Sequence, residues 1–83
     1  MERAEIFAAL CEIAAKVLGI SKEEITEDSD FFEDLGADSF YMADMVIQIE
    51  DQWDIEIDDE DIQDMQTVRQ ILDHVEMLLK LKS

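Results

Sequence analysis

The fold depends most on residues 38–53, which read DSFYMADMVIQIEDQW. Apolar residues recur there every three or four positions, which is the spacing of an amphipathic α-helix. On a helical wheel one face collects the apolar residues that we expect in a core: Met42, Met45, Val46, Ile49 and Trp53. The opposite face carries Phe40, Asp44, Ile47, Gln48 and Asp51. Two apolar side chains two turns apart, Phe40 and Ile47, therefore point away from the core among acids.

Three further helices are expected around this segment. Residues 3–18 carry an apolar stripe at helical spacing, and Gly19 is a suitable stop. A short helix is expected at 59–65, and the last helix begins at a capping box from Thr67 to Gln70. The chain has no proline and only two glycines. The sequence therefore predicts an all-α fold: a small antiparallel four-helix bundle with three longer helices and one short one.

Residues 19–38 form a long connection between the first two helices. Ser21 and Glu24 have the spacing of a capping box for a short helical turn. A structureless loop of this length is uncommon unless it is packed or functional. We expect its apolar side chains to pin it onto the core; they are Ile20, Ile25, Phe31, Phe32 and Leu35.

Acidic residues dominate the composition. The 83 residues, which we expect to form one domain over 1–83, contain 23 acids and 6 bases, for a net charge of −17. Between Glu23 and Val68 there are 18 acids and no Lys or Arg. The acids of such a block repel one another. The block can be simply a solvated surface, or a surface that binds basic protein partners or divalent cations. It argues against nucleic acid and anionic lipid, whose phosphates attract Lys and Arg.

The rest of the composition is typical of a small protein whose cysteine stays in the thiol form. No apolar run reaches about 18 residues, and the first residues lack a secretory pattern. The single cysteine, Cys11, excludes an internal disulfide and is expected to be a partly buried, inert thiol. We therefore expect a cytoplasmic monomer that makes no membrane contact.

Ordinary catalytic and metal-binding patterns are missing from the sequence. There is no nucleophile elbow and no glycine-rich phosphate loop. Asp28 and Asp30 begin like an EF-hand, but Phe32 and Glu33 occupy positions that calcium binding needs for other residues. The only histidine, His74, falls beside the apolar stripe and is expected at the surface or its boundary. We therefore expect neither a catalytic site nor a metal site.

Ser39 is the residue that stands out. A serine at a helix start ordinarily caps the first N–H groups. Asp38 is an equally good cap, however, so the Ser39 hydroxyl is available for another role. A phosphate attached there would lie near a helix N-terminus, which favours anions.

Residues 32–40, FEDLGADSF, resemble the attachment motif of acyl carrier proteins, whose fatty-acid form reads F-x-E-D-L-G-A-D-S-L. The resemblance covers essentially the whole chain without a gap. Further matching positions are Val46, Ile49, Glu50, Trp53, Glu56, Ile57, Asp59, Glu60, Thr67, Val68 and Val75.

The resemblance implies that Ser39 receives 4′-phosphopantetheine from coenzyme A, with Asp38 as its motif neighbour. A magnesium-dependent phosphopantetheinyl transferase performs this step, and the arm's thiol then holds acyl groups as thioesters. The carrier is not an enzyme. It presents its cargo to acyl-transferring, ketosynthase-type or other biosynthetic enzymes with basic docking surfaces. We expect these partners to contact Phe40, Tyr41, Asp44, Ile47, Glu50 and Asp51.

Several residues depart from the fatty-acid form: Phe40, Tyr41, Met42, Ala43, Asp44, Trp53 and Asp58. Most lie in the helix that partner enzymes read. They favour a carrier of a polyketide or other specialised pathway over fatty-acid biosynthesis, with an aminoacyl carrier as a further alternative. Two other functions stay open: an unmodified acidic adaptor for basic partners, and a small hydrolase that would need His74 beside Ser39.

Overall fold

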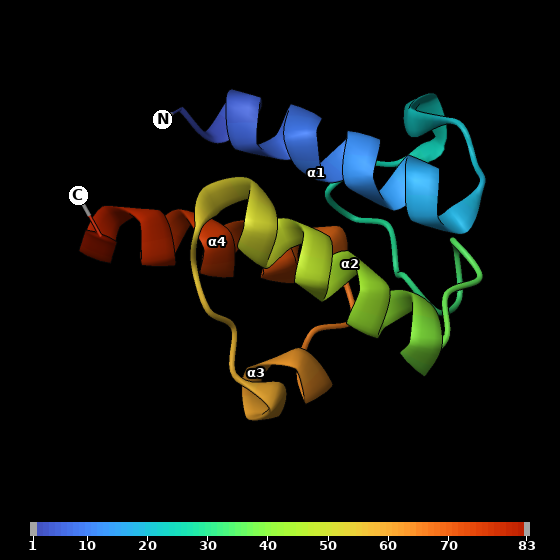
Figure 1. The fold of residues 1–83 in the computed structure, drawn as a ribbon. Helices are drawn as coiled ribbons and strands as arrows, with labels where there is room; N and C mark the ends of the chain where they lie inside the picture. The colour runs from blue at the N-terminus through green and yellow to red at the C-terminus, as the bar shows by residue number, and fades with distance from the viewer. Residues whose placement is uncertain (1, 83) are drawn as a thin grey trace.

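The computed structural model describes residues 2–82, and it is all-helical over that range (Figure 1). Its elements are α1 (Arg3–Leu18), the 3-10 turn η1 (Lys22–Glu24), α2 (Ser39–Trp53), α3 (Asp59–Gln63) and α4 (Val68–Lys82). These bounds confirm the all-α prediction with three longer helices and one short one. The short helix ends earlier than expected, at Gln63, although Met65 beyond it is buried. No helix in this range is long and apolar enough to cross a bilayer.

α1 is the element around which the other long helices pack. It contacts both α2 and α4, and it runs antiparallel to each of them (Figure 1). α2 and α4 run in roughly the same direction, because the chain turns back through α3 between them. Gly19 follows the last residue of α1, and its left-handed φ of 70° lets the N–H of Ile20 turn back to the Ala15 carbonyl at 3.1 Å.

The buried face of α2 is the one that the sequence predicts. Met42, Met45, Val46, Ile49 and Trp53 are all buried. They meet apolar side chains of the other helices, among which Ile6, Leu72 and Val75 are completely enclosed. Burial of this continuous apolar surface is the main source of stability in a fold of this size.

The long loop is tied to the start of α4 by backbone hydrogen bonds. The N–H of Val68 donates to the Ser29 carbonyl at 3.0 Å, and the N–H of Arg69 donates to the Glu27 carbonyl at 2.9 Å. These bonds satisfy donors that a helix leaves unpaired in its first turn. Ile25 and Phe31 anchor the loop in the core as expected.

Phe32 does not follow the prediction that it packs in the core. Its side chain is 43% exposed, while the adjacent Phe31 is buried. The two residues are consecutive, so only one of them points inward here. Phe32 instead lines an open groove that is described below.

Bases from outside the acidic block reach into it. Arg3 contacts carboxylates of the loop and α4 at 2.7–3.3 Å, namely Glu27, Asp73 and Glu76. Its hydrogen bonds with Asp73 and Glu27 raise the pKa of Arg3 above the ordinary value. Arg69 pairs with Asp28 and Glu27. The sequence does not predict these pairs, which hold the loop against both α1 and α4.

We expect Arg3→Gln to lower the melting temperature by a few degrees more than Lys16→Gln does. Both changes remove one positive charge from α1, but only Arg3 joins three carboxylates from two other segments. Thermal unfolding followed by circular dichroism would measure the difference. Equal losses would show that only the net charge matters.

Candidate functional site

The loop before Ser39 has a conformation that its own side chains and backbone hold in place. The Asp30 carboxylate accepts hydrogen bonds from the N–H groups of Phe32 and Glu33, at 2.8 and 2.9 Å. The Asp34 carboxylate in turn accepts from the Asp30 N–H at 2.8 Å. These carboxylates therefore fix the conformation of the loop. No group of three or more potential metal-binding side chains occurs in the described part of the chain.

Gly36 and Ala37 connect the loop to the start of α2. Gly36 has a φ of 72°, which favours glycine, and Ala37 is buried. The Ala37 N–H donates to the Phe31 carbonyl at 2.7 Å. Phe31 is itself joined to Gln66, just ahead of α4, by a 2.8 Å backbone bond. Ser39 therefore follows a segment that is held at both the core and α4.

Asp38, and not Ser39, caps α2. The Asp38 carboxylate accepts a hydrogen bond from the Tyr41 N–H at 3.1 Å. Ser39 is exposed in the first turn, and within residues 2–82 its hydroxyl has no hydrogen-bond partner. The expectation that Asp38 frees this hydroxyl therefore agrees with the local geometry.

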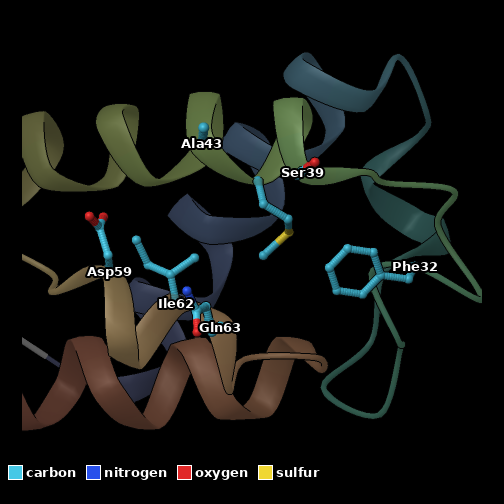
Figure 2. A pocket seen from close by; sticks show the side chains of 7 residues that line it. Phe32, Ser39, Ala43, Asp59, Ile62 and Gln63 are labelled. Atoms are coloured by element: carbon cyan, nitrogen blue, oxygen red, sulfur yellow. The ribbon is translucent and has the colours of Figure 1, made fainter.

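An open groove of about 450 Å³ lies beside Ser39. Its walls come from α2, the loop and α3, through Phe32, Ser39, Met42, Ala43, Asp59, Ile62 and Gln63. Figure 2 shows Phe32 at one end of the groove and the three α3 residues at the other, with Ser39 and Ala43 on α2. The lining is mainly apolar and includes the Ser39 hydroxyl.

The groove and the start of α2 meet at Ser39. The Ser39 hydroxyl is exposed, the start of the helix favours anions such as phosphate, and the apolar lining begins beside it. Met42 and Ile62 contribute apolar surface to the groove.

The outward face of α2 carries the exposed anchors that the sequence predicts. Phe40 is 86% exposed and Ile47 is 61% exposed. Asp44 and Asp51 are exposed on the same face. Tyr41 is exposed beside them and not in the core. Apolar side chains this accessible, bordered by acids, are typical of a protein docking surface.

Glu50 has a different environment from the other predicted docking residues. It is half-buried, and its carboxylate accepts a hydrogen bond from the Ile57 N–H at 2.8 Å. The contact ties α2 to the chain leading into α3. Glu50 therefore has a structural partner within the chain, and its contact with partner enzymes stays a prediction.

Two other candidate residues lie away from the groove. His74 faces Asp61 of α3, with 3.6 Å between Nε2 and Oδ2, and it does not line the groove with Ser39. The structure therefore does not place His74 beside Ser39, as the hydrolase hypothesis requires. Cys11 is buried more deeply than expected, and burial raises the pKa of its thiol. The thiol is protonated at neutral pH, which agrees with an inert role.

Sequence analysis missed the contribution of α3 to the site. Asp59, Ile62 and Gln63 reach the groove from about 20 residues beyond Ser39. The acidic segment 58–64 has no apolar periodicity that would indicate this contact. The one signal available was Ile62, an apolar residue among acids.

Comparisons with known proteins agree on one family. The sequence model described as Phosphopantetheine attachment site matches residues 8–75. An acyl carrier protein of Thermotoga maritima is 34% identical over 77 residues, covering 93% of this chain and 95% of the relative. An acyl carrier protein of Chlorobium phaeovibrioides is 35% identical over 75 residues, covering 90% and 96%.

A solved structure extends the likeness to three dimensions. The crystal structure of the Thermotoga maritima acyl carrier protein matches with a TM-score of 0.87 and 34% identity. The match covers 100% of this chain and 96% of that one.

We expect Asp38→Ala to lower the free energy of unfolding by about 1 kcal/mol, because it removes the α2 cap. Asp38→Asn retains a side-chain acceptor and should cost much less. Ser39→Ala should leave stability within about 0.5 kcal/mol, since its hydroxyl has no partner. Urea unfolding followed at the helical circular dichroism band would test this. A larger loss from Ser39→Ala than from Asp38→Ala would assign the cap to Ser39.

Proposed function

This chain belongs to the acyl carrier protein family, and we propose that Ser39 is where its 4′-phosphopantetheine arm is attached. The family's arm is covalent and its thiol holds acyl groups as thioesters. The observation that carries the assignment is the exposed Ser39 hydroxyl, which has no partner because Asp38 caps the helix. A transferase needs such an accessible oxygen on a rigid element.

The groove beside Ser39 is proposed to shelter the cargo nearest the arm. Phe32, Met42 and Ile62 give it an apolar lining, and methionine adapts readily to different apolar shapes. Because the groove is open, its contents stay accessible to a docking enzyme. This role requires no catalytic group, and we propose that the chain catalyses nothing itself.

The docking surface is proposed to consist of Phe40, Tyr41, Asp44, Ile47 and Asp51. Phe40 and Ile47 supply exposed apolar anchors, and Asp44 and Asp51 supply an acidic rim. Its partners are the phosphopantetheinyl transferase and acyl-transferring or ketosynthase-type enzymes with basic surfaces. None of the lysines or arginines of the chain belongs to α2, which supports this charge complementarity.

The proposal extends to the pathway, the oligomeric state and the compartment of the protein. The bulky aromatic pair Phe40 and Tyr41 supports a polyketide or other specialised pathway over fatty-acid biosynthesis. We propose that the chain works as one domain over residues 1–83, as a monomer in the cytoplasm. The main alternative is an acidic helical adaptor that binds basic partners without ever being modified.

We expect one phosphopantetheinyl group on Ser39 after incubation with coenzyme A, magnesium and a broad-specificity phosphopantetheinyl transferase. Intact-protein mass spectrometry would detect the added group, and peptide mapping would locate it. Ser39→Ala should gain nothing while keeping its helical circular dichroism. Ser21→Ala is the matched control, because Ser21 is also exposed at a helix start but bonds to Glu23.

Two results would contradict the assignment. Unmodified wild-type protein, with the transferase active on a control carrier, would favour the unmodified adaptor. Modification of Ser39→Ala would place the arm on another residue.

The two kinds of docking residue should affect different rate constants. Ile47→Ala removes an exposed anchor and should raise the dissociation rate from a cognate enzyme about tenfold or more. Asp44→Lys with Asp51→Lys should instead slow association and weaken its salt dependence, because rim charges steer encounter. Stopped-flow binding would separate these effects.

The control for this experiment is Glu2→Lys with Glu5→Lys. It reverses the same number of charges on exposed positions of the N-terminal region, away from α2. Equal slowing of association by both double variants would mean that partners respond only to the net charge of the protein. The proposed docking surface would then be contradicted.

A further inference from the structure

The groove between α2 and α3 combines an apolar wall with polar groups at one end. Met42 of α2 and Ile62 of α3 supply apolar side chains to its lining. Asp59 and Gln63 also line it, and they are neighbours on one face of α3 because they are four residues apart. Figure 2 shows both at the end away from Phe32, with the Asp59 carboxylate directed toward α2. The groove therefore changes from apolar to polar along its length.

The polar groups at this end have no partners of their own. Within residues 2–82, the Asp59 carboxylate and the Gln63 side-chain amide form no hydrogen bond and no ion pair. No lysine or arginine of that range lines the groove, so no cation neutralises Asp59 there. A carboxylate accepts hydrogen bonds, and bonds from a charged donor are stronger than bonds from a neutral one. This end of the groove is therefore suited to a cationic hydrogen-bond donor.

A ligand attached at Ser39 can use contacts that are too weak to hold a free ligand. An ion pair with an exposed carboxylate such as Asp59 contributes little by itself. A short flexible link, however, raises the effective concentration of a tethered group into the millimolar range. Ser39 lines the same groove, one turn of α2 before Ala43. The relevant ligand is therefore the group at the end of an arm held by Ser39.

We propose that the groove recognises an acyl group that has an apolar body and ends in a protonated amine. The acyl chain lies against Met42 and Ile62, and its ammonium group donates hydrogen bonds to the Asp59 carboxylate and the Gln63 side-chain oxygen. An aliphatic amine carries this charge at neutral pH because its pKa is close to that of lysine, about 10.4. This recognition rests on the proposed carrier function, and it names the class of cargo that the carrier holds.

The test compares three acyl chains of similar length attached at position 39. Aminohexanoyl ends in an ammonium group, heptanoyl is its uncharged counterpart, and adipoyl ends in a carboxylate. Each is joined through a linker of pantetheine length to the Ser39→Cys variant by iodoacetamide chemistry, which forms a thioether and releases iodide. Cys11 is buried, and burial raises the pKa of its thiol, so we expect it to stay unmodified. Intact-protein mass spectrometry verifies a single attachment.

Nuclear magnetic resonance measures how often each acyl chain occupies the groove. Nuclear Overhauser contacts from the acyl methylene groups to the methyl groups of Met42 and Ile62 report this occupancy. Adding Asp59→Asn should lower the occupancy by aminohexanoyl about two- to fivefold, because the ammonium group loses its charged partner. The same change should leave heptanoyl unchanged and raise the occupancy by adipoyl, whose carboxylate Asp59 repels.

Glu60→Gln is the matched control for Asp59→Asn. It removes one negative charge from an adjacent exposed residue of α3 that does not line the groove. The occupancy by each of the three acyl chains should therefore stay the same. Gln63→Leu should weaken the contact of aminohexanoyl and strengthen that of heptanoyl, because it replaces the polar amide by an apolar side chain.

Three outcomes would overturn the proposal. Equal losses for aminohexanoyl and heptanoyl in Asp59→Asn would show that Asp59 only shapes the groove. A loss of the same size in Glu60→Gln would show that only the net charge matters. An equal response of the linker without an acyl chain would assign the contact to the linker.

The chemical attachment keeps this test separate from that of the proposed function. None of its outcomes depends on whether a transferase modifies Ser39. A groove without preference for the amine would leave the carrier function intact, whereas an unmodified Ser39 in the mass-spectrometry experiment would contradict that function. The two failures are therefore distinguishable.

Discussion

The fold depends on a few positively charged side chains that hold together a strongly acidic chain. Arg3 is central, because one guanidinium joins α1 to Glu27 of the loop and to Asp73 and Glu76 of α4. Lys82 acts similarly at the other end, where it donates to the Trp53 and Asp54 carbonyls and so complements the C-terminus of α2. Because these bases lie near the chain ends, they close the fold without neutralising the outward face of α2. The fold is therefore held together while the outward face of α2 keeps its exposed acids, Asp44 and Asp51.

Hydrogen bonds order the loop in addition to its ion pairs with Arg3 and Arg69. Its carbonyl groups accept from the first N–H groups of α4, and Asp30 accepts from the N–H groups that follow it. Carboxylates that accept backbone N–H groups gain a partner without needing a base. This arrangement carries the chain through Gly36 and Ala37 to a helix whose cap, Asp38, is separate from its exposed serine. The position of Ser39 thus follows from the hydrogen bonds within the loop and between the loop and α4.

The elements that the sequence predicts well are those where periodicity and capping residues coincide. The bounds of α1 follow from its stripe and Gly19, and the core face of α2 is correct at every position. Phe32 was assigned to the wrong environment because a loop has no period that separates inward from outward side chains. The role of Glu50 was missed because its partner is a backbone N–H at Ile57, which no side-chain pattern reveals. The α3 wall of the groove is a long-range contact, and a single sequence carries no direct signal of it.

α2 and α3 differ in how firmly the rest of the fold holds them. Ser39 lies on a helix with five buried side chains and a capped start. α3 has no side-chain cap at its start and contributes no buried residue. Segments with few buried contacts open at low free-energy cost. α3 can therefore shift at lower cost than α2, whose buried side chains hold the helix that carries Ser39.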